Sequence, residues 1–434
     1  KYDVKIETTE EFKAKVSEIE STEGYRRPIM YGICRNDMGI ANVEAVLQST
    51  FIVNNVDENH GSAAILTAAL VQDASEVVKK SNVVHQSTSE AVYTIDGEFL
   101  EKALDMFAPY IAEANEDLSK HLNVQAITAV SRVQEMLSDP MRANGNIFGN
   151  LNYTYRVVFI YEDTAVETVE AGYLKLYALS ETKSGIRTLN LDGLFGKLTN
   201  CAWTIAGEPI ELETLEARSI EMKAFGQYPP IMAVDKFPRM LQHVIPNENV
   251  RILDSSKVRM GAHLAAGTVV MPGASYINFN AGTNGKVMVE GRISSSAIVG
   301  ANSDVGGGAS ILGVLSGTDG DPITVGEKCL LGANSTCGIS LGNGCIIDAG
   351  VAILPGTKVN MLLEEFNKIF EANIDNSHAG ELKKVIVENE CTKIEIKGSE
   401  LSGYHGMHYR QDSRNGAIMV SRSTREVVLN SDLH

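Results

Sequence analysis

A six-residue spacing of aliphatic side chains constrains the fold of this chain more than any other feature. Between residues 258 and 359 these positions form three sets: Val258, Leu264 and Val270; Ile293, Val299, Val305 and Ile311; Val325, Leu331, Leu341, Ile347, Ile353 and Val359. Neither the period of an α-helix nor that of a strand produces this spacing. A small or β-branched residue usually follows four residues later, as Ala297 follows Ile293. The pattern is typical of a hexapeptide β-helix, in which each unit forms one wall of a triangular prism with its aliphatic side chain inside.

The six-residue spacing is interrupted twice, and a run of three glycines, Gly306 to Gly308, lies between the interruptions. We expect the turn-rich stretches NFNAGTNGK (278–286) and SGTDGDP (316–322) to be loops that leave the coil. Glycine fits the corners of such a coil, where φ is positive or another backbone approaches closely. Backbone N–H groups there can also approach a ligand, such as the oxygen of a thioester. Coils of this kind are typically left-handed and commonly assemble as trimers, with active sites in the clefts between neighbouring prisms.

The regions on either side of the coil have different patterns. Residues 1–250 mix helical patterns such as EEFKAKVSEIES with strand patterns such as YRVVFIYED, which indicates an α/β region. The Asn- and Gly-rich stretch 141–152 is a possible boundary inside it. Residues 251–360 are predicted to form the left-handed parallel β-helix. Residues 361–434 are predicted to form a small β-rich C-terminal domain that begins with a helix in LLEEFNKIFEAN.

Composition and charge narrow the classes of partner. The formal net charge of −17 argues against nucleic acid or a membrane as the main partner, because both need a basic surface. We find no signal peptide and no apolar run long enough to span a bilayer, so we expect a cytoplasmic protein with reduced thiols. Between residues 258 and 360 the only histidine is His263, which excludes a zinc enzyme with several wall histidines. Three cysteines eight residues apart are expected to pack in the coil wall: Cys329, Cys337 and Cys345.

Glu290 and Arg292 lie where the coil resumes after the first interruption. A carboxylate at this place could remove a proton from an amine or attack a thioester itself. It could equally be solvated or form an ion pair with Arg292. His263 is the alternative general base, although no neighbouring acid supports that role. Further along the chain, Lys397 and Arg410 could bind the phosphate groups of an anionic cofactor.

Several longer stretches carry a family pattern. Within the coil they are VRMGAHLAAGTVVMPGASYINFNAGTNGKVMVEGRIS, VGANSDVGGGASILGVLSG and CLLGANSTCGISLGNGCIIDAGVAILPGTKV; outside it they are LFGKLTNCAW, VDKFPRM, ELSG, RQDS and LNSDLH. Together they resemble the tetrahydrodipicolinate N-succinyltransferases, in their longer form, over about residues 190 to 434. The resemblance implies transfer of succinyl from succinyl-CoA to the amino group of ring-opened tetrahydrodipicolinate, in lysine and diaminopimelate biosynthesis. It also implies a homotrimer.

The resemblance implies roles for individual residues as well. Glu290, in the VEGR motif, corresponds to the catalytic glutamate, which the family is described as using as an acyl-anhydride nucleophile; a general-base role stays open beside it. Asp348 stands where the family has a glutamate. Contacts with succinyl-CoA are implied for Arg292, Gly307, Ser310, Ala333, Asp348, Ala349, Gly356, Lys397, Arg410, Gln411, Asp412 and Ser413.

Two further departures from the family pattern affect these expectations. The positions of the magnesium site on the three-fold axis of some members, around Ser256 and Gly273, offer no carboxylate, so no metal is predicted. Residues 361–385 form an insertion, whose helix we expect near the exit of the CoA groove. Two alternative functions remain: another CoA-dependent N-acyltransferase of the hexapeptide class, or a non-catalytic trimeric scaffold.

Overall fold

The computed structural model describes residues 5–58, 60–71, 82–113, 121–139, 152–314, 318, 320–379, 393–423 and 428–434. The chain divides into two compact units. One comprises Lys1–Ala178 and Leu189–Pro238, and the other comprises Leu179–Thr188 and Arg239–His434. Apart from Asn152, the predicted boundary stretch 141–152 lies outside the described residues. None of the helices in the described ranges has the length and apolar character needed to cross a membrane.

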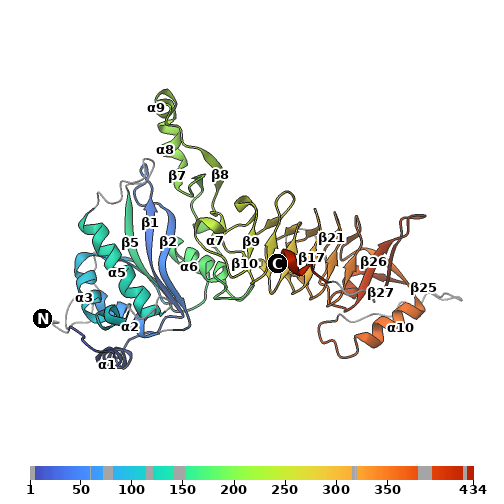
Figure 1. Ribbon diagram of the computed structural model, residues 1–434, viewed down its shortest axis with the longest axis horizontal. Coiled ribbons are helices and arrows are strands. Elements are labelled where there is room, and N and C mark those ends of the chain that lie inside the picture. The colour runs from blue at the N-terminus through green and yellow to red at the C-terminus, as the bar shows by residue number, and fades with distance from the viewer. Residues whose placement is uncertain are drawn as a thin grey trace. The chain divides into compact units, whose positions relative to one another are not determined.

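A five-stranded antiparallel sheet forms the centre of the first unit (Figure 1), in the order β2-β1-β5-β4-β3. Its strands are β1 (Met30–Met38), β2 (Val46–Val56), β3 (Val83–Gln86), β4 (Glu90–Thr94) and β5 (Tyr153–Ile160). The described residues before β5 form the helices α1 (Thr9–Glu20), α2 (His60–Leu70), α3 (Gly97–Phe107), α4 (Pro109–Glu113) and α5 (Leu122–Ser138). The helix predicted from EEFKAKVSEIES is confirmed as α1, which a capping box of Thr8 and Glu11 begins. The strand predicted from YRVVFIYED is confirmed as β5.

The two faces of this sheet are covered differently. One face shares a buried apolar cluster with helices α1, α2, α3 and α5; it includes Phe12, Phe99 and Phe159. Helix α6 (Val169–Ser180) contacts the other face, where the rings of Phe51 and Tyr177 lie 5.4 Å apart. Both faces of the sheet are therefore buried, as the α/β pattern predicts.

A small sheet, in the order β7-β6-β8, completes the first unit. Its elements are β6 (Cys201–Thr204), β7 (Pro209–Glu211) and β8 (Ile231–Asp235), with the short helices α7 (Leu194–Lys197), α8 (Leu212–Ala217) and α9 (Ser219–Ala224). The carboxylate of Glu211 accepts hydrogen bonds from the backbone N–H groups of Ile40, Ala41 and Asn42. These bonds fasten the small sheet to the connection between β1 and β2.

The second unit contains the predicted left-handed parallel β-helix. The first wall carries β10 (His263–Leu264), β13 (Gly282–Thr283), β16 (Ile298–Val299) and β19 (Thr324–Val325). The second carries β9 (Arg251–Ile252), β11 (Val269–Val270), β14 (Val287–Val289), β17 (Ser303–Val305), β20 (Leu330–Leu331) and β22 (Ile346–Ile347). The third carries β12 (Tyr276–Ile277), β15 (Arg292–Ile293), β18 (Ser310–Ile311), β21 (Thr336–Cys337) and β23 (Ala352–Ile353). Every side chain that the six-residue spacing predicts to point inward is buried, at 3 % exposure or less.

The chain stays in the coil through the first interruption of the six-residue spacing. The prediction that residues 278–286 form a loop outside the coil is therefore wrong. This segment contributes β13, between β12 and β14, and the inward positions there are taken by Ile277, Thr283 and Val289, all 0 % exposed. Two features hide the repeat: Ile277 follows Val270 by seven residues, and Thr283 is polar. The hydroxyl groups of Thr283 and Thr268 lie 2.7 Å apart, which satisfies them inside the prism. Residues 316, 317 and 319 of the second predicted loop lie outside the described residues. The described residues between β18 and β19 contain no strand, and β19 pairs directly with β16 of the preceding turn.

The coil ends in a mixed sheet that continues its second wall (Figure 1). β22 pairs in parallel with β26 (Met407–Gln411), which pairs with β27 (Ile418–Arg422), then β24 (Lys358–Leu362) and β25 (Lys393–Lys397). The predicted helix after the coil is confirmed as α10 (Leu363–Ala372), which contacts this sheet through buried Phe366 and Ile369. The C-terminal segment thus extends the coil wall by direct strand pairing, within the same compact unit as the coil.

We expect Leu331→Ala to lower the melting temperature far more than Leu330→Ala. Leu331 points into the prism and is fully buried, whereas Leu330 beside it points outward and is only partly buried. Removing a buried leucine side chain costs about 2–5 kcal/mol, because the surrounding core collapses only partly into the cavity. Scanning calorimetry of the two variants measures the difference. Equal losses would contradict the assignment of the inward face.

Candidate functional site

Stacking of the coils aligns the predicted catalytic glutamate with two glycines, an aspartate and an arginine. The backbone N–H groups of Glu290, Gly306, Gly332 and Asp348 each donate to the carbonyl of the inward residue on the next strand, at 2.7 to 3.0 Å. These bonds place one row of residues on successive turns, which we call the corner row: Glu290, Gly306, Gly332, Asp348 and Arg410. Neighbouring strands are about 4.8 Å apart, so the row is about 19 Å long from Glu290 to Arg410.

The two glycines keep the middle of the corner row free of side chains. A Cβ atom on Gly306 would lie 2.5 Å from the carbonyl oxygen of Leu331, and one on Gly332 would lie 2.5 Å from the backbone nitrogen of Ala349. The residues that follow Gly306, Gly332 and Asp348 in the chain are also small, and all three are predicted cofactor contacts: Gly307, Ala333 and Ala349. A Cβ atom on Gly307 would lie 3.7 Å from Oε2 of Glu290, so the carboxylate lies beside this open edge.

Arg292 and Ser310 lie together on the next wall of the prism. They are opposite each other on β15 and β18, and Nη2 of Arg292 donates to Oγ of Ser310 at 2.5 Å. Within the described part of the chain, Arg292 forms no ion pair with Glu290. The ion pair considered from the sequence therefore does not occupy the Glu290 carboxylate.

Asp348 is held by two side chains of β26 at the far end of the corner row. Its Oδ1 lies 2.7 Å from Nε2 of His408, and its Oδ2 accepts a hydrogen bond from Nε of Arg410 at 3.0 Å. Burial opposes ionisation of Asp348, but these hydrogen bonds and the charge of Arg410 outweigh it and lower the pKa of the carboxyl below its ordinary value. The terminal nitrogens of Arg410 make no hydrogen bond with any residue that the structure describes. Asp348 thus orients the exposed guanidinium of Arg410 and leaves its terminal nitrogens available to bind a ligand.

The other predicted cofactor residues fall into two groups. Gln411, Asp412 and Ser413 follow Arg410 directly, at the turn between β26 and β27. Gly356 follows β23, and Lys397 ends β25. The next residues in the chain are joined by a hydrogen bond, from the N–H of Gly398 to the carbonyl of Thr357 at 2.8 Å, so both lie together at a different corner of the prism. The structure therefore does not bring all predicted contacts to one edge of a single chain.

One titratable residue near Glu290, Asp304, was missed in the sequence. Asp304 lies on β17, opposite Met288 of β14. Burial raises the pKa of Asp304, the charge of Glu290 raises it further, and His434 lowers it. The signal was present in the six-residue spacing: Asp304 directly precedes inward Val305, so it occupies an outward position in an otherwise uncharged stretch.

The histidine and cysteines of the coil serve as wall residues. Nδ1 of His263 lies 3.1 Å from the carbonyl oxygen of Thr283, and burial lowers the pKa of this histidine. The three coil cysteines are fully buried, as predicted, and burial raises the pKa of Cys337 to about 12. A thiol in this state is a poor nucleophile.

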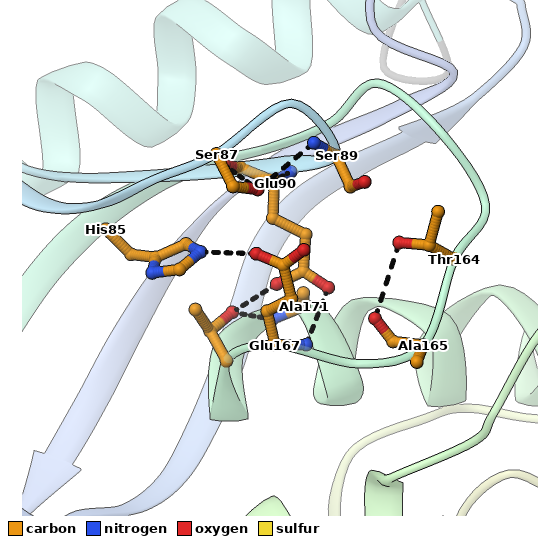
Figure 2. Close-up of polar contacts among 9 residues, drawn as sticks. His85, Ser87, Ser89, Glu90, Thr164, Ala165, Glu167 and Ala171 are labelled. Carbon is orange, nitrogen blue, oxygen red and sulfur yellow. Dashed lines mark hydrogen bonds and ion pairs between the residues drawn. The ribbon is translucent and has the colours of Figure 1, made fainter.

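A second polar cluster, in the first unit, has the residue types of a metal site (Figure 2). His85, Glu90 and Glu167 offer ligand atoms within 4.8 Å of one another. The Glu90 carboxylate, however, accepts hydrogen bonds from the N–H of Glu167 and the hydroxyl of Thr168, both at 3.0 Å, at the start of α6. Nε2 of His85 lies 2.7 Å from Oε2 of Glu167. These contacts account for the cluster as a cap on α6, since carboxylates stabilise helix N-termini.

Comparisons with known proteins identify the family. The models of the tetrahydrodipicolinate N-succinyltransferase N-terminal and middle regions match residues 10–196 and 198–239, and a model of the hexapeptide repeat of succinyl-transferase matches residues 322–355. The chain is 52% identical, over 429 residues, to the 2,3,4,5-tetrahydropyridine-2,6-dicarboxylate N-succinyltransferase of Sulfurovum sp. (strain NBC37-1), with 99% of each chain covered. The chain belongs to the tetrahydrodipicolinate N-succinyltransferase family.

Membership in the tetrahydrodipicolinate N-succinyltransferase family extends over nearly the whole chain. The relative of the same name from Campylobacter jejuni is 46% identical over 429 residues, which cover 99% of this chain and 100% of the relative. A crystal structure of a putative 2,3,4,5-tetrahydropyridine-2-carboxylate N-succinyltransferase from Campylobacter jejuni superposes with a TM-score of 0.82 at 44% identity, covering 98% of this chain and 100% of that one. The motifs in the sequence reached back only to about residue 190, so the comparisons add the N-terminal region to the match.

We expect the stability difference between the wild type and Asp348→Asn to vanish at low pH. A carboxyl whose pKa is lowered by folding stabilises the folded state above its unfolded pKa, about 3.9, and loses that contribution as the pH falls through the folded value. The wild type should therefore melt at a higher temperature than the variant at neutral pH, and the gap should begin to narrow only as the pH falls below about 4. Melting temperatures measured along a pH series check this. A gap that stays constant with pH would show that the ionised carboxylate is not the stabilising form.

Proposed function

We propose that this chain transfers succinyl from succinyl-CoA to the amino group of ring-opened tetrahydrodipicolinate, a step of lysine and diaminopimelate biosynthesis. The observation that carries the proposal is the corner row, with Glu290 at one end and the Asp348-held Arg410 at the other. Four strand spacings make the row about 19 Å long, and we propose that an extended pantetheine arm lies along it. The thioester then reaches Glu290 while the phosphate groups meet Arg410. Relatives named for this activity match over almost the full length.

The middle of the corner row suits an extended acyl donor. Gly306 and Gly332 present backbone rather than side chains, so the arm can lie against the coil. Backbone N–H groups near Gly307 can stabilise the thioester oxygen as negative charge develops on it. Arg292, fixed by Ser310, offers a cation to the free carboxylate of the succinyl group, which an acetyl group lacks.

The transfer requires one proton to move from nitrogen to sulfur. The N–C bond of the amide forms, the C–S bond of the thioester breaks, the acceptor nitrogen loses a proton and the CoA sulfur gains one. Glu290 can act in two ways: as general base for the amine, or as nucleophile that first forms an acyl anhydride. Its position beside the open edge at Gly307 is compatible with both roles.

The proposal includes a homotrimer that binds succinyl-CoA in the clefts between neighbouring coils. The division of the predicted contacts supports it: Gly356 and Lys397 lie at one corner of the prism, and Glu290 lies at another. In a trimer of prisms, the corner of one chain faces a different corner of its neighbour. Light scattering should give three times the chain mass, and full activity of a monomer would contradict the arrangement.

We expect Glu290→Gln to abolish thiol release from succinyl-CoA while the fold is kept. The amide cannot accept a proton or attack a thioester, and loss of such a group reduces turnover by about 10²–10⁴-fold. Release of CoA in the presence of the amino-dicarboxylate acceptor measures the effect, with acetyl-CoA as the comparison donor. Glu327→Gln, which changes an exposed carboxylate of the same coil, is the matched control. Full activity of Glu290→Gln would remove Glu290 from the mechanism.

Arg410→Ala should raise the KM for succinyl-CoA by roughly ten- to a hundredfold, with a smaller change in kcat. The reason is the loss of charge-assisted hydrogen bonds to phosphate, each worth about 1.5–3 kcal/mol. Arg414→Ala is the matched control, because Arg414 is an exposed arginine of the adjoining turn, outside the predicted contacts. Steady-state kinetics of both variants give the comparison. Equal effects from the two variants would mean that general surface charge, not the corner row, attracts the donor.

A further inference from the structure

Asp304 lies on the outer face of the wall that leads to Glu290. The residues on either side of it in β17 are fully buried in the coil, so the side chain between them points outward. β17 pairs with β14 so that Asp304 lies opposite Met288, two residues before Glu290. Glu290 itself lies opposite Gly306, which has no side chain to separate the two carboxyl groups. The register therefore makes Asp304 and Glu290 diagonal neighbours on one surface.

The two carboxyl groups have different surroundings. Asp304 is half-buried, and its pKa is raised by burial and by the charge of Glu290. No described residue makes a hydrogen bond with its carboxyl oxygens. An acid whose pKa is moved toward neutrality is a better proton acceptor in catalysis than an ordinary aspartate. Pairs of carboxyl groups in which one accepts the proton and the other stays ionised commonly divide acid–base and nucleophilic roles.

We propose that Asp304 is the general base that takes the proton from the acceptor amine, which leaves Glu290 to act as the nucleophile. This inference rests on the proposed succinyl transfer and assigns the two roles that the site alone leaves open. Asp304 then releases the proton to solvent, which its half-buried side chain still reaches.

The proposed steps balance in atoms and protons. Glu290 attacks the thioester, the C–S bond breaks, and CoA leaves as a thiolate that takes a proton from solvent. The amine then attacks the succinyl carbonyl of the anhydride, the N–C bond forms, and the bond from that carbonyl to the Glu290 oxygen breaks. Asp304 takes the proton that the nitrogen loses and releases it to solvent. One proton has moved from nitrogen to sulfur, and both carboxylates are restored.

The two half-reactions can be measured separately. Without acceptor, rapid mixing with succinyl-CoA should give a burst of CoA equal to the sites and a hydroxylamine-sensitive acyl-enzyme, in the wild type and in Asp304→Asn alike. With acceptor, Asp304→Asn should turn over about a hundredfold more slowly than the wild type. Asp304→Glu should recover part of that rate. Glu290→Gln should give no burst, and Glu327→Gln should behave as the wild type.

Each other outcome overturns a defined part of the proposal. Normal turnover of Asp304→Asn excludes Asp304 as the base, and loss of its burst places Asp304 in the first half-reaction or in folding. A wild type that releases CoA only with acceptor present excludes the nucleophilic role of Glu290. A wild type that releases no CoA even with acceptor overturns the proposed function itself.

Discussion

Hydrogen bonding between successive turns of the coil is the constraint on which the rest of the second unit depends. Each turn is held to the next by parallel backbone bonds, so a residue's neighbours in space are set by register rather than by distance along the chain. Gly306 and Gly332 are adjacent on this basis, although the long connection between β18 and β19 separates them in sequence. That connection begins after a strand of the third wall and ends at a strand of the first wall, so it lengthens the chain without shifting the corner row. A groove that crosses several turns can therefore stay straight.

In the first unit, buried ion pairs and a helix cap hold helix α6 on the sheet. Glu170 of this helix is buried and pairs with Arg156 of the sheet, and Lys175 is buried and pairs with Asp163 at 2.9 Å. Glu90 caps the start of the same helix. Removing one partner of a buried pair costs about 3–5 kcal/mol, because the other charge is left without a partner. These contacts fix the rotation and position of α6 on the sheet more narrowly than apolar packing alone.

The fold can be predicted from the sequence where an aliphatic residue recurs at every sixth position. The prediction fails where a residue of another type takes the inward position. The inward column was readable because an aliphatic side chain marks nearly every turn. Thr283 broke the prediction, since a polar inward residue is tolerated only when a partner such as Thr268 satisfies it, and that partner lies on another turn. The Asp348–Arg410 pair was equally hidden, because it forms only after the C-terminal sheet adds β26 to the wall. The sequence named both residues but could not pair them.

The net charge of the chain and the charge of Arg410 affect an anionic ligand at different distances. With a formal charge of −17, the chain as a whole repels both succinyl-CoA and a dicarboxylate acceptor. At physiological ionic strength, charges separated by more than about 8 Å are largely screened, so the nearest oriented groups decide affinity. Arg410 is such a group, although Asp348 cancels part of its charge. Asp348 also orients the guanidinium of Arg410. Because Nε is bound to Asp348, the two terminal nitrogens face away from the carboxylate and can form two hydrogen bonds with a phosphate. The acidic surface then governs how fast anions arrive, and the corner row governs whether they stay.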